Sequence, residues 1–264
     1  MKMEQDTRIT DGQKFETALK YWLACLADDE LTLGHRDSEW LGLCPDIEGD
    51  VAFSSIAQDE VGHAVFYFDL LHQLGEGDPD RLAFSRDQHL RRNAILLERP
   101  NGDWAYSILR HYFYDLFDDL RLQSMESSSY APLRQGTQKI RREEYYHLLH
   151  MKTLFSRLGS AGGQARERME EALLKVWPDL GDLFDFGPYE KELLEFGIIS
   201  LSGSEVRRRW EEQVRDALLS IGFEWPGEIP SSSRSGRRGE HSSDLQPLLD
   251  TLCEVYAIDS NARW

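Results

Sequence analysis

Cysteine is scarce in this chain of 264 residues, which has only Cys25, Cys44 and Cys253. An odd number of widely spaced cysteines argues against a disulfide framework, and no pair has the Cys-x-x-Cys spacing of a thiolate metal site. Long hydrophobic runs are also missing. A membrane-spanning helix needs roughly 20 apolar residues, and the sequence shows neither such a stretch nor a charged-then-apolar N-terminal signal. We therefore expect a cytoplasmic protein without a membrane partner.

Basic residues are in the minority. Lys and Arg number 30 against 47 Asp and Glu, and the formal net charge is −17. Phosphate backbones and anionic lipid surfaces repel a protein of this charge, so nucleic acid is not an expected partner. An anionic substrate would need a local basic patch or a more basic partner chain.

Hydrophobic residues at helical spacing are the main feature that the sequence does have. They recur every three or four positions in four long stretches, each bounded by Pro, Gly or Ser. No run of strand length with alternating polarity competes with the helical interpretation. The sequence therefore predicts an all-α protein, with long helices at about residues 15–40, 51–74, 103–127 and 133–158.

The connection between the second and third helices is long, from Glu76 to Asp103, with room for a short helix. A crossover of this length links the second and third helices of ferritin-like bundles. We therefore expect a ferritin-like four-helix bundle over residues 1–160 and a C-terminal helical extension over 161–264, packed on the bundle as a single domain. Within the extension we expect helices at about 164–177, 188–197, 204–221 and 244–256, and a flexible Ser-, Gly- and Arg-rich loop at 231–243.

Two short segments repeat one pattern, an acidic residue followed by Glu-x-x-His. They are Asp59-Glu60-Val61-Gly62-His63 and Glu143-Glu144-Tyr145-Tyr146-His147. Residues three apart share a face of a helix, so each Glu and His can reach one metal ion from the same side. A single Glu-x-x-His arises easily by chance, so the motif needs support from its context.

That support comes from spacing and register. Glu30 precedes Glu60 by thirty residues and Asp115 precedes Glu144 by twenty-nine, so each pair can meet across a helical hairpin. The Glu and His positions also continue the apolar stripes of their helices. A buried carboxylate is costly unless it is paired or bound to metal. The expected metal ligands are Glu30, Glu60, His63, Asp115, Glu144 and His147.

Acidic residues beside the ligands are expected to support them. Asp59 and Glu143 can each accept a hydrogen bond from the imidazole on the opposing helix, which would fix its tautomer. On the third helix Asp119 shares the face of Asp115, and it is both a supporting residue and the alternative ligand; the symmetry of the spacing favours Asp115. The remaining histidines are expected to be structural or surface residues: His35, His72, His89, His111, His150 and His241. Of these, His150 is the one close enough to His147 for a supporting role.

Carboxylates with one imidazole for each metal suit iron or manganese better than zinc-thiolate chemistry. We therefore expect two iron ions as the cofactor, with manganese as the alternative. Two ferrous ions bridged by carboxylates can bind dioxygen and share the electrons for its reduction.

The chain resembles the C-type subunits of bacterial phenylacetyl-CoA epoxidases, which are ferritin-like multicomponent monooxygenases. The segments that carry the resemblance are Gly75–Asp78, Leu82–Asp87, Leu96–Gly102, Tyr112–Asp115, Leu154–Gly159 and Trp264. The resemblance implies cytosolic phenylacetate breakdown, in which the complex uses dioxygen and reductase-supplied electrons to epoxidise the ring of phenylacetyl-CoA. It implies as partners a catalytic A-type subunit, further subunits and a reductase component, in a homo- or hetero-oligomer.

The chain departs from this family in one respect. The best-known C-type subunits have degenerate metal positions and are regarded as structural, whereas all six positions are intact here. Three functions follow: an epoxidase subunit with its own di-iron site, a non-catalytic structural partner, or a ferritin-class iron-oxidising or storage protein. About one hundred extra C-terminal residues argue against a ferritin-class protein.

The clusters Arg141-Arg142 and Arg207-Arg208-Arg209 could contact a CoA phosphate, but solvated faces or salt bridges are the favoured interpretation.

Overall fold

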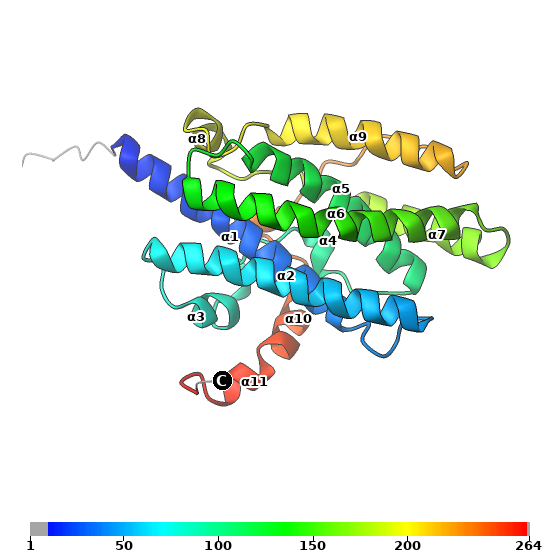
Figure 1. Ribbon diagram of the computed structural model, residues 1–264, viewed down its shortest axis with the longest axis horizontal. Coiled ribbons are helices and arrows are strands. Elements are labelled where there is room, and N and C mark those ends of the chain that lie inside the picture. The colour runs from blue at the N-terminus through cyan, green and yellow to red at the C-terminus, as the bar shows by residue number, and fades with distance from the viewer. Residues whose placement is uncertain (1–9, 263–264) are drawn as a thin grey trace, which may run out of the picture.

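The computed structural model describes residues 10–262, and Trp264, which contributes to the family resemblance, lies outside them. All regular secondary structure in this part of the chain is helical, which confirms the all-α prediction. Four helices are much longer than most of the others and run side by side along the molecule (Figure 1). They form the predicted ferritin-like bundle: α1 (Asp11–Ser38), α2 (Ile47–Gln73), α5 (Trp104–Met125) and α6 (Ala131–Ser160).

The first two helices begin about four residues earlier than their apolar patterns indicate, because polar residues cap them. The Thr10 hydroxyl accepts from the backbone N–H of Gln13 at 3.3 Å, and the Gln13 side chain accepts from the Thr10 N–H at 2.9 Å. At the start of α2, Asp46 accepts from the Gly49 N–H at 2.7 Å. Such caps satisfy backbone donors that have no partner within the helix.

Close packing of α1 on α2 determines the register of the first hairpin. A Cβ atom at Gly34 would lie 3.0 Å from Cβ of Glu60 and 3.2 Å from the carbonyl oxygen of Ala57. Gly34 is thus the α1 residue that faces Glu60. Glu30 lies about one helical turn away from Gly34, and its carboxylate is 3.6 Å from Nδ1 of His63.

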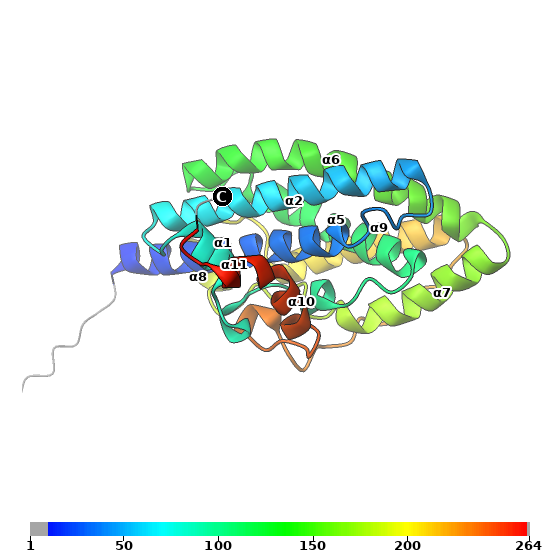
Figure 2. The ribbon, with the colours of Figure 1, turned by 90° about the horizontal axis from the view of Figure 1, so that it is seen from below.

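The crossover between α2 and α5 contains short helical segments, as expected. They are α3 (Pro79–Phe84), the 3₁₀ turn η1 (Gln88–Leu90) and α4 (Ile95–Glu98). Helix α3 contacts α2 and α4 contacts α1, so the crossover lies against the first hairpin. Figure 2 shows this side of the bundle, with the C-terminal helices on the same side.

The C-terminal extension packs on α5. Its helices are α7 (Gln164–Val176), the 3₁₀ turn η2 (Trp177–Asp179), α8 (Glu190–Glu195) and α9 (Gly203–Ser220), and both α7 and α9 contact α5. The fully buried Trp210 of α9 donates from Nε1 to the Phe113 carbonyl oxygen at 2.8 Å. One hydrophobic cluster includes residues of both the bundle and the extension, from Ala18 to Ile229.

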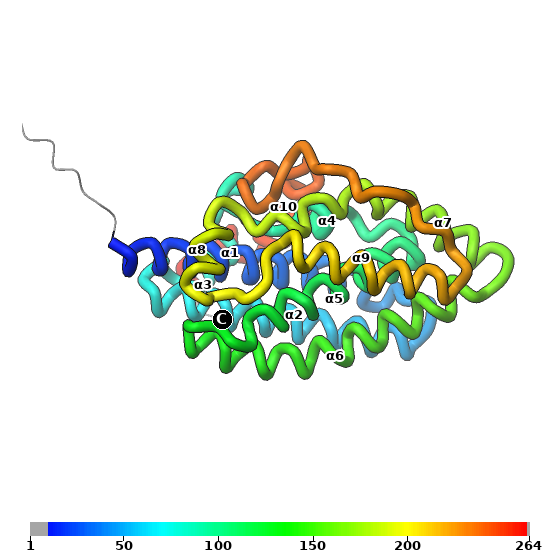
Figure 3. Tube along the Cα trace, turned by 90° about the horizontal axis from the view of Figure 1, so that it is seen from above, coloured from blue at the N-terminus to red at the C-terminus, as the bar shows by residue number. Residues whose placement is uncertain are grey.

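After α9 the chain returns along the outside of the molecule (Figure 3). It then forms the 3₁₀ turn η3 (Gly236–Arg238) and two short helices, α10 (Leu245–Leu252) and α11 (Glu254–Ile258), so the single helix expected at 244–256 is interrupted at Cys253. The expectation of a flexible loop at 231–243 is wrong for its second half. Residues Ser235, Gly236, Arg237 and Ser242 are buried. The composition of this segment is typical of a flexible loop, but residues distant in the sequence bury these four residues, and composition does not reveal such contacts. None of the helices in residues 10–262 is long and apolar enough to cross a membrane.

Candidate metal centre

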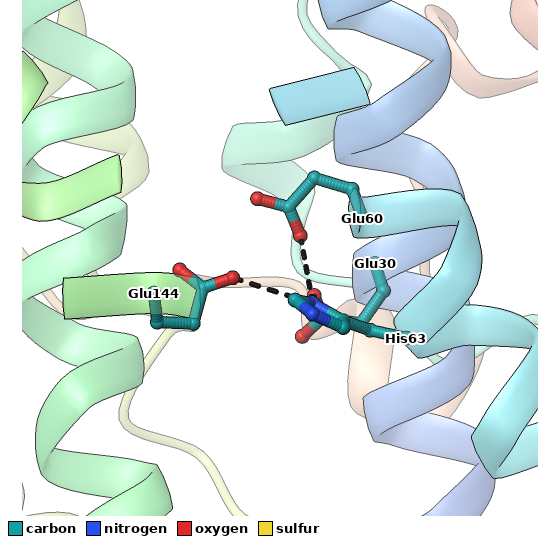
Figure 4. Close-up of side chains that lie close together, drawn as sticks. All are labelled: Glu30, Glu60, His63 and Glu144. Atoms are coloured by element: carbon teal, nitrogen blue, oxygen red, sulfur yellow. Dashed lines mark ion pairs between the residues drawn. The ribbon is translucent and has the colours of Figure 1, made fainter. Parts of the chain in front are cut away.

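The two Glu-x-x-His segments lie on α2 and α6 and face the interior of the bundle. Glu60 and His63 come from α2, Glu144 and His147 from α6, and Glu30 from α1; each has at most 5% of its surface exposed. Ligand atoms of Glu30, Glu60, His63 and Glu144 all lie within 4.8 Å of one another. Figure 4 shows Glu144 approaching the other three from the opposite side. The fold therefore brings these four predicted ligands together in one buried cluster.

The Nδ1 atoms of both imidazoles point into this cluster. Nδ1 of His63 lies 3.3 Å from Glu144, 3.6 Å from Glu30 and 3.7 Å from Glu60. Nδ1 of His147 lies 3.1 Å from Glu144 and 3.3 Å from Glu60. Glu60 and Glu144 thus lie near both imidazoles, where a carboxylate can bridge two metal ions.

The other ring nitrogen of each histidine contacts an acid on the opposite helix. Nε2 of His63 lies 3.1 Å from Oε2 of Glu143, and Nε2 of His147 lies 3.3 Å from Oδ2 of Asp59. An ionised carboxylate can only accept, so each Nε2 carries the hydrogen. These are the contacts expected of Asp59 and Glu143, and in the neutral imidazole they leave the Nδ1 lone pair free for a metal.

Asp115, the ligand predicted on α5, is fully buried and bonded to a histidine. Its Oδ1 lies 2.6 Å from Nδ1 of His111, and Nε2 of His111 lies 3.0 Å from Oδ2 of Asp37 on α1. With a carboxylate at each nitrogen, His111 carries two ring hydrogens and is an imidazolium. One ligand atom each of Asp37, Glu60 and His111 also lie within 4.8 Å of one another. His111 therefore joins Asp115 of α5 to Asp37 of α1.

Asp119, the alternative ligand, lies outside this cluster. Its carboxylate accepts from Gln123 at 2.7 Å and from Arg141 of α6 at 3.1 Å. Arg141 is thereby engaged in a salt bridge, as are Arg207 and Arg208 with glutamates four residues later on α9. The half-buried His150 shows no hydrogen bond from Nε2 within the described residues.

Arg121 of α5 is a buried cation at the edge of the cluster that sequence analysis did not identify. Its Nη2 donates to Oε1 of Glu30 at 3.1 Å and to the Tyr114 hydroxyl at 2.8 Å, and its Nε donates to Asp118 at 2.7 Å. It also pairs with Asp29. Arg121 therefore holds one oxygen of Glu30 while the other faces His63.

The acids of the cluster govern the protonation of the histidines. Burial alone would lower the pKa of His147, but Glu144 and Glu60 raise it to about 12. For His63, burial is likewise outweighed by Glu144, Glu30 and Glu60, and its pKa lies far above the usual range. Burial raises the pKa of Asp115 to about 6 against the opposing effect of His111. Without a metal, protons at Nδ1 therefore balance part of the buried negative charge.

Several donor atoms in the cluster fit a metal ion because they have no other partner. Within residues 10–262, both oxygens of Glu60 and Nδ1 of His63 are buried and form no hydrogen bond. The buried Oδ2 of Asp115, which is not among the four residues brought together, also forms none within this range. A buried polar atom without a partner costs about 1–3 kcal/mol. Carboxylate oxygens with imidazole nitrogens form the donor set that binds divalent transition metals.

The buried charges lead to the same conclusion. Three neighbouring acids have buried cations of their own, and these pairs balance. They are Asp29 with Arg237, Asp118 with Arg121, and Asp37 with the imidazolium of His111. The remaining buried carboxylates of this region are Glu30, Glu60 and Glu144 of the four-residue group, and Asp115 of α5. Four negative charges among neutral imidazole ligands match the charge of two divalent cations.

The bundle and its cluster define a protein of the ferritin-like class whose buried carboxylates and histidines can bind metal. The family model described as "Phenylacetic acid catabolic protein" matches residues 1–264, and the chain belongs to that family. The chain is similar to the C-type subunit of the 1,2-phenylacetyl-CoA epoxidase of Escherichia coli (strain K12), with 30% identity over 240 residues, which are 90% of this chain and 96% of that protein.

Proposed function

We propose that this chain is a subunit of a phenylacetyl-CoA epoxidase complex in aerobic phenylacetate breakdown, and that it holds a carboxylate-bridged di-iron centre. The family match over the whole chain supports the pathway. The observation that supports the metal centre most directly is the convergence of ligand atoms from Glu30, Glu60, His63 and Glu144 at one buried point, where both oxygens of Glu60 and Nδ1 of His63 have no hydrogen-bond partner within the described residues. Manganese is the alternative metal.

The residues have distinct roles in this proposal. Glu60 and Glu144 lie near both imidazoles and would be shared between two ions, His63 and His147 would each hold one ion, and Glu30 and Asp115 would complete the set. Two ferrous ions held by these residues would supply electrons for binding and reducing dioxygen. Nδ1 of His63 and of His147 would each have to lose its proton to hold a metal ion, while Glu143 and Asp59 keep the proton of each imidazole on Nε2. The low exposure of all six ligands keeps water away from the centre.

The proposal also assigns partners. A C-type subunit works beside a catalytic A-type subunit, further subunits and a reductase that delivers electrons, with phenylacetyl-CoA and dioxygen as substrates in the cytoplasm. The similarity to a protein named as one subunit of an epoxidase supports a hetero-oligomer.

A structural, non-catalytic partner of the A-type subunit is the second candidate function. The position of Arg121 favours it: a buried guanidinium bonded to Glu30 supplies positive charge to the cluster without a metal. With protonated His63 and His147, the bundle can therefore be stable in the metal-free state.

Metal content of the purified chain tests the di-iron centre. We expect close to two iron ions for each wild-type chain after anaerobic loading, and a large loss in Glu60→Ala and Glu144→Ala. Glu126→Ala removes an exposed glutamate at the C-terminal end of α5 and serves as the control. Sub-stoichiometric iron that is the same in all four proteins would contradict the proposal.

Reconstitution separates catalysis from scaffolding. The same variants are combined with the A-type subunit, the further subunits and the reductase, and epoxidation of phenylacetyl-CoA is followed. A loss of turnover in Glu60→Ala with intact assembly supports a catalytic centre in this chain. Full turnover from a metal-free chain would leave the structural function.

A further inference from the structure

Arg237 is a buried cation that the C-terminal segment inserts into the bundle. It belongs to η3, more than two hundred residues from its main partner, and only 1% of its surface is exposed. Its guanidinium forms two bonds with the Asp29 carboxylate of α1, at 2.8 Å and 2.7 Å. A third bond, at 2.7 Å, goes to the carbonyl oxygen of Arg92 in the crossover.

Asp29 connects Arg237 to the metal centre because it is shared between two guanidiniums. The carboxylate of Asp29 also pairs with Arg121, whose Nη2 donates to Oε1 of Glu30 at 3.1 Å. The result is a continuous chain of buried ion pairs, Arg237 to Asp29 to Arg121 to Glu30. The second oxygen of Glu30 faces Nδ1 of His63 at 3.6 Å.

Hydrogen bonds on both sides of Arg237 anchor the segment that carries it. The Gly236 N–H donates to Asp182 at 3.3 Å, and Ser242 donates to Glu98 from its N–H at 2.8 Å and from its hydroxyl at 2.6 Å. A Cβ atom at Gly236 would lie 1.9 Å from the Asn93 carbonyl oxygen. Only glycine therefore allows η3 to approach the crossover this closely.

We infer that Arg237 is a positioning residue for the metal centre and acts through Asp29 and Arg121 on Glu30, an inference that rests on the proposed function. By neutralising Asp29, Arg237 leaves Arg121 free to hold Oε1 of Glu30, so that Oε2 points to the metal. Without Arg237, the buried Asp29 carboxylate has Arg121 as its main cation and draws the guanidinium away from Glu30. Glu30 then loses the donor that orients it, and residues behind a metal ligand typically contribute about 10–100-fold to affinity.

Metal affinity of the full chain tests this inference, with Arg237→Met as the central variant. The ion pair of the neighbouring Arg238 with Asp185 is at the surface, so Arg238→Met is the matched control. Metal-free proteins are titrated with Fe²⁺ under anaerobic conditions against a chelating dye, and circular dichroism gives the folded fraction. We expect about tenfold weaker binding in Arg237→Met, partial recovery in Arg237→Lys, and wild-type affinity in Arg238→Met.

The double variant Arg237→Met/Asp29→Asn distinguishes positioning from folding. Asparagine at position 29 carries no charge that could draw Arg121 from Glu30. The double variant is therefore expected to bind Fe²⁺ like wild type. It replaces the single variant in the test if Arg237→Met does not fold. Wild-type affinity in a folded Arg237→Met, or a double variant about tenfold weaker than wild type, would overturn the inference alone. A wild-type chain that takes up no metal would overturn the proposed function as well.

Discussion

His63 and Glu143 are eighty residues apart and on different helices, yet Nε2 of the imidazole lies 3.1 Å from the carboxylate. His147 and Asp59 repeat the contact in the reverse direction at 3.3 Å. Each Glu-x-x-His helix thus supplies the acid that orients the other helix's histidine. Neither α2 nor α6 can build its half of the centre alone.

Removal of these acids is expected to weaken metal binding without unfolding the bundle. Glu143→Ala or Asp59→Ala leaves the imidazole free to rotate and to change tautomer, which should lower metal affinity by about 10–100-fold. Anaerobic Fe²⁺ titration measures the effect. Asp69→Ala, at an exposed position of α2, is the control. Unchanged affinity in both variants would show that Asp59 and Glu143 do not support the histidines.

Glu60 is expected to reduce the stability of the metal-free chain. Both of its oxygens lack hydrogen-bond partners within the described residues, and 1% of its surface is exposed. Glu60→Gln removes a buried charge of nearly the same shape and should raise the free energy of unfolding by about 1–2 kcal/mol while abolishing metal binding. Urea unfolding in the presence of chelator measures the change. A less stable glutamine variant would mean that the histidines fully compensate the charge.

Asp182 is expected to make stability depend on pH. Burial raises the pKa of Asp182 to about 7, although the Ile95 N–H, Arg237 and the Gly236 N–H act in the opposite direction. The pKa of the folded state lies above that of the unfolded chain, so this group favours folding at low pH and its contribution is lost between about pH 4 and pH 7.

Asp182→Asn isolates this contribution because one amide oxygen can still accept from both backbone N–H groups. Relative to wild type, the variant should gain on the order of 2 kcal/mol of unfolding free energy between pH 4.5 and pH 8. Urea titrations at both values provide the comparison. A stability difference that does not change with pH would contradict the raised pKa.

Trp210 is expected to fix the C-terminal extension to the bundle. It is fully buried against α5 and donates to the Phe113 carbonyl oxygen at 2.8 Å. Trp210→Ala should cost about 3–5 kcal/mol of unfolding free energy through lost contacts and a cavity. Leu219→Ala on the same helix removes a side chain that is 75% exposed and should change stability by less than about 0.5 kcal/mol. Equal, small losses would show that α9 contributes little to folding.

Sequence alone determined the helical bundle and most of the buried cluster of carboxylates and histidines. Helical periodicity is local, so apolar stripes predict the long helices, and Glu60 with His63 or Glu144 with His147 must share a face whatever surrounds them. The repeated acid one residue before each glutamate was enough to predict the contacts that Asp59 and Glu143 make.

Tertiary structure alone decided which other charges reach the centre. Asp115 and Asp119 lie one turn apart on the same face, and the spacing that favours Asp115 does not reveal their partners, which are His111 for Asp115 and Arg141 for Asp119. Arg121 and Arg237 have no local signature, because the partner that buries each guanidinium lies 92 and 208 residues away. A charge can be buried only where the fold brings an opposite charge to it, and the spacing of residues along the sequence does not tell which distant charges will be in contact.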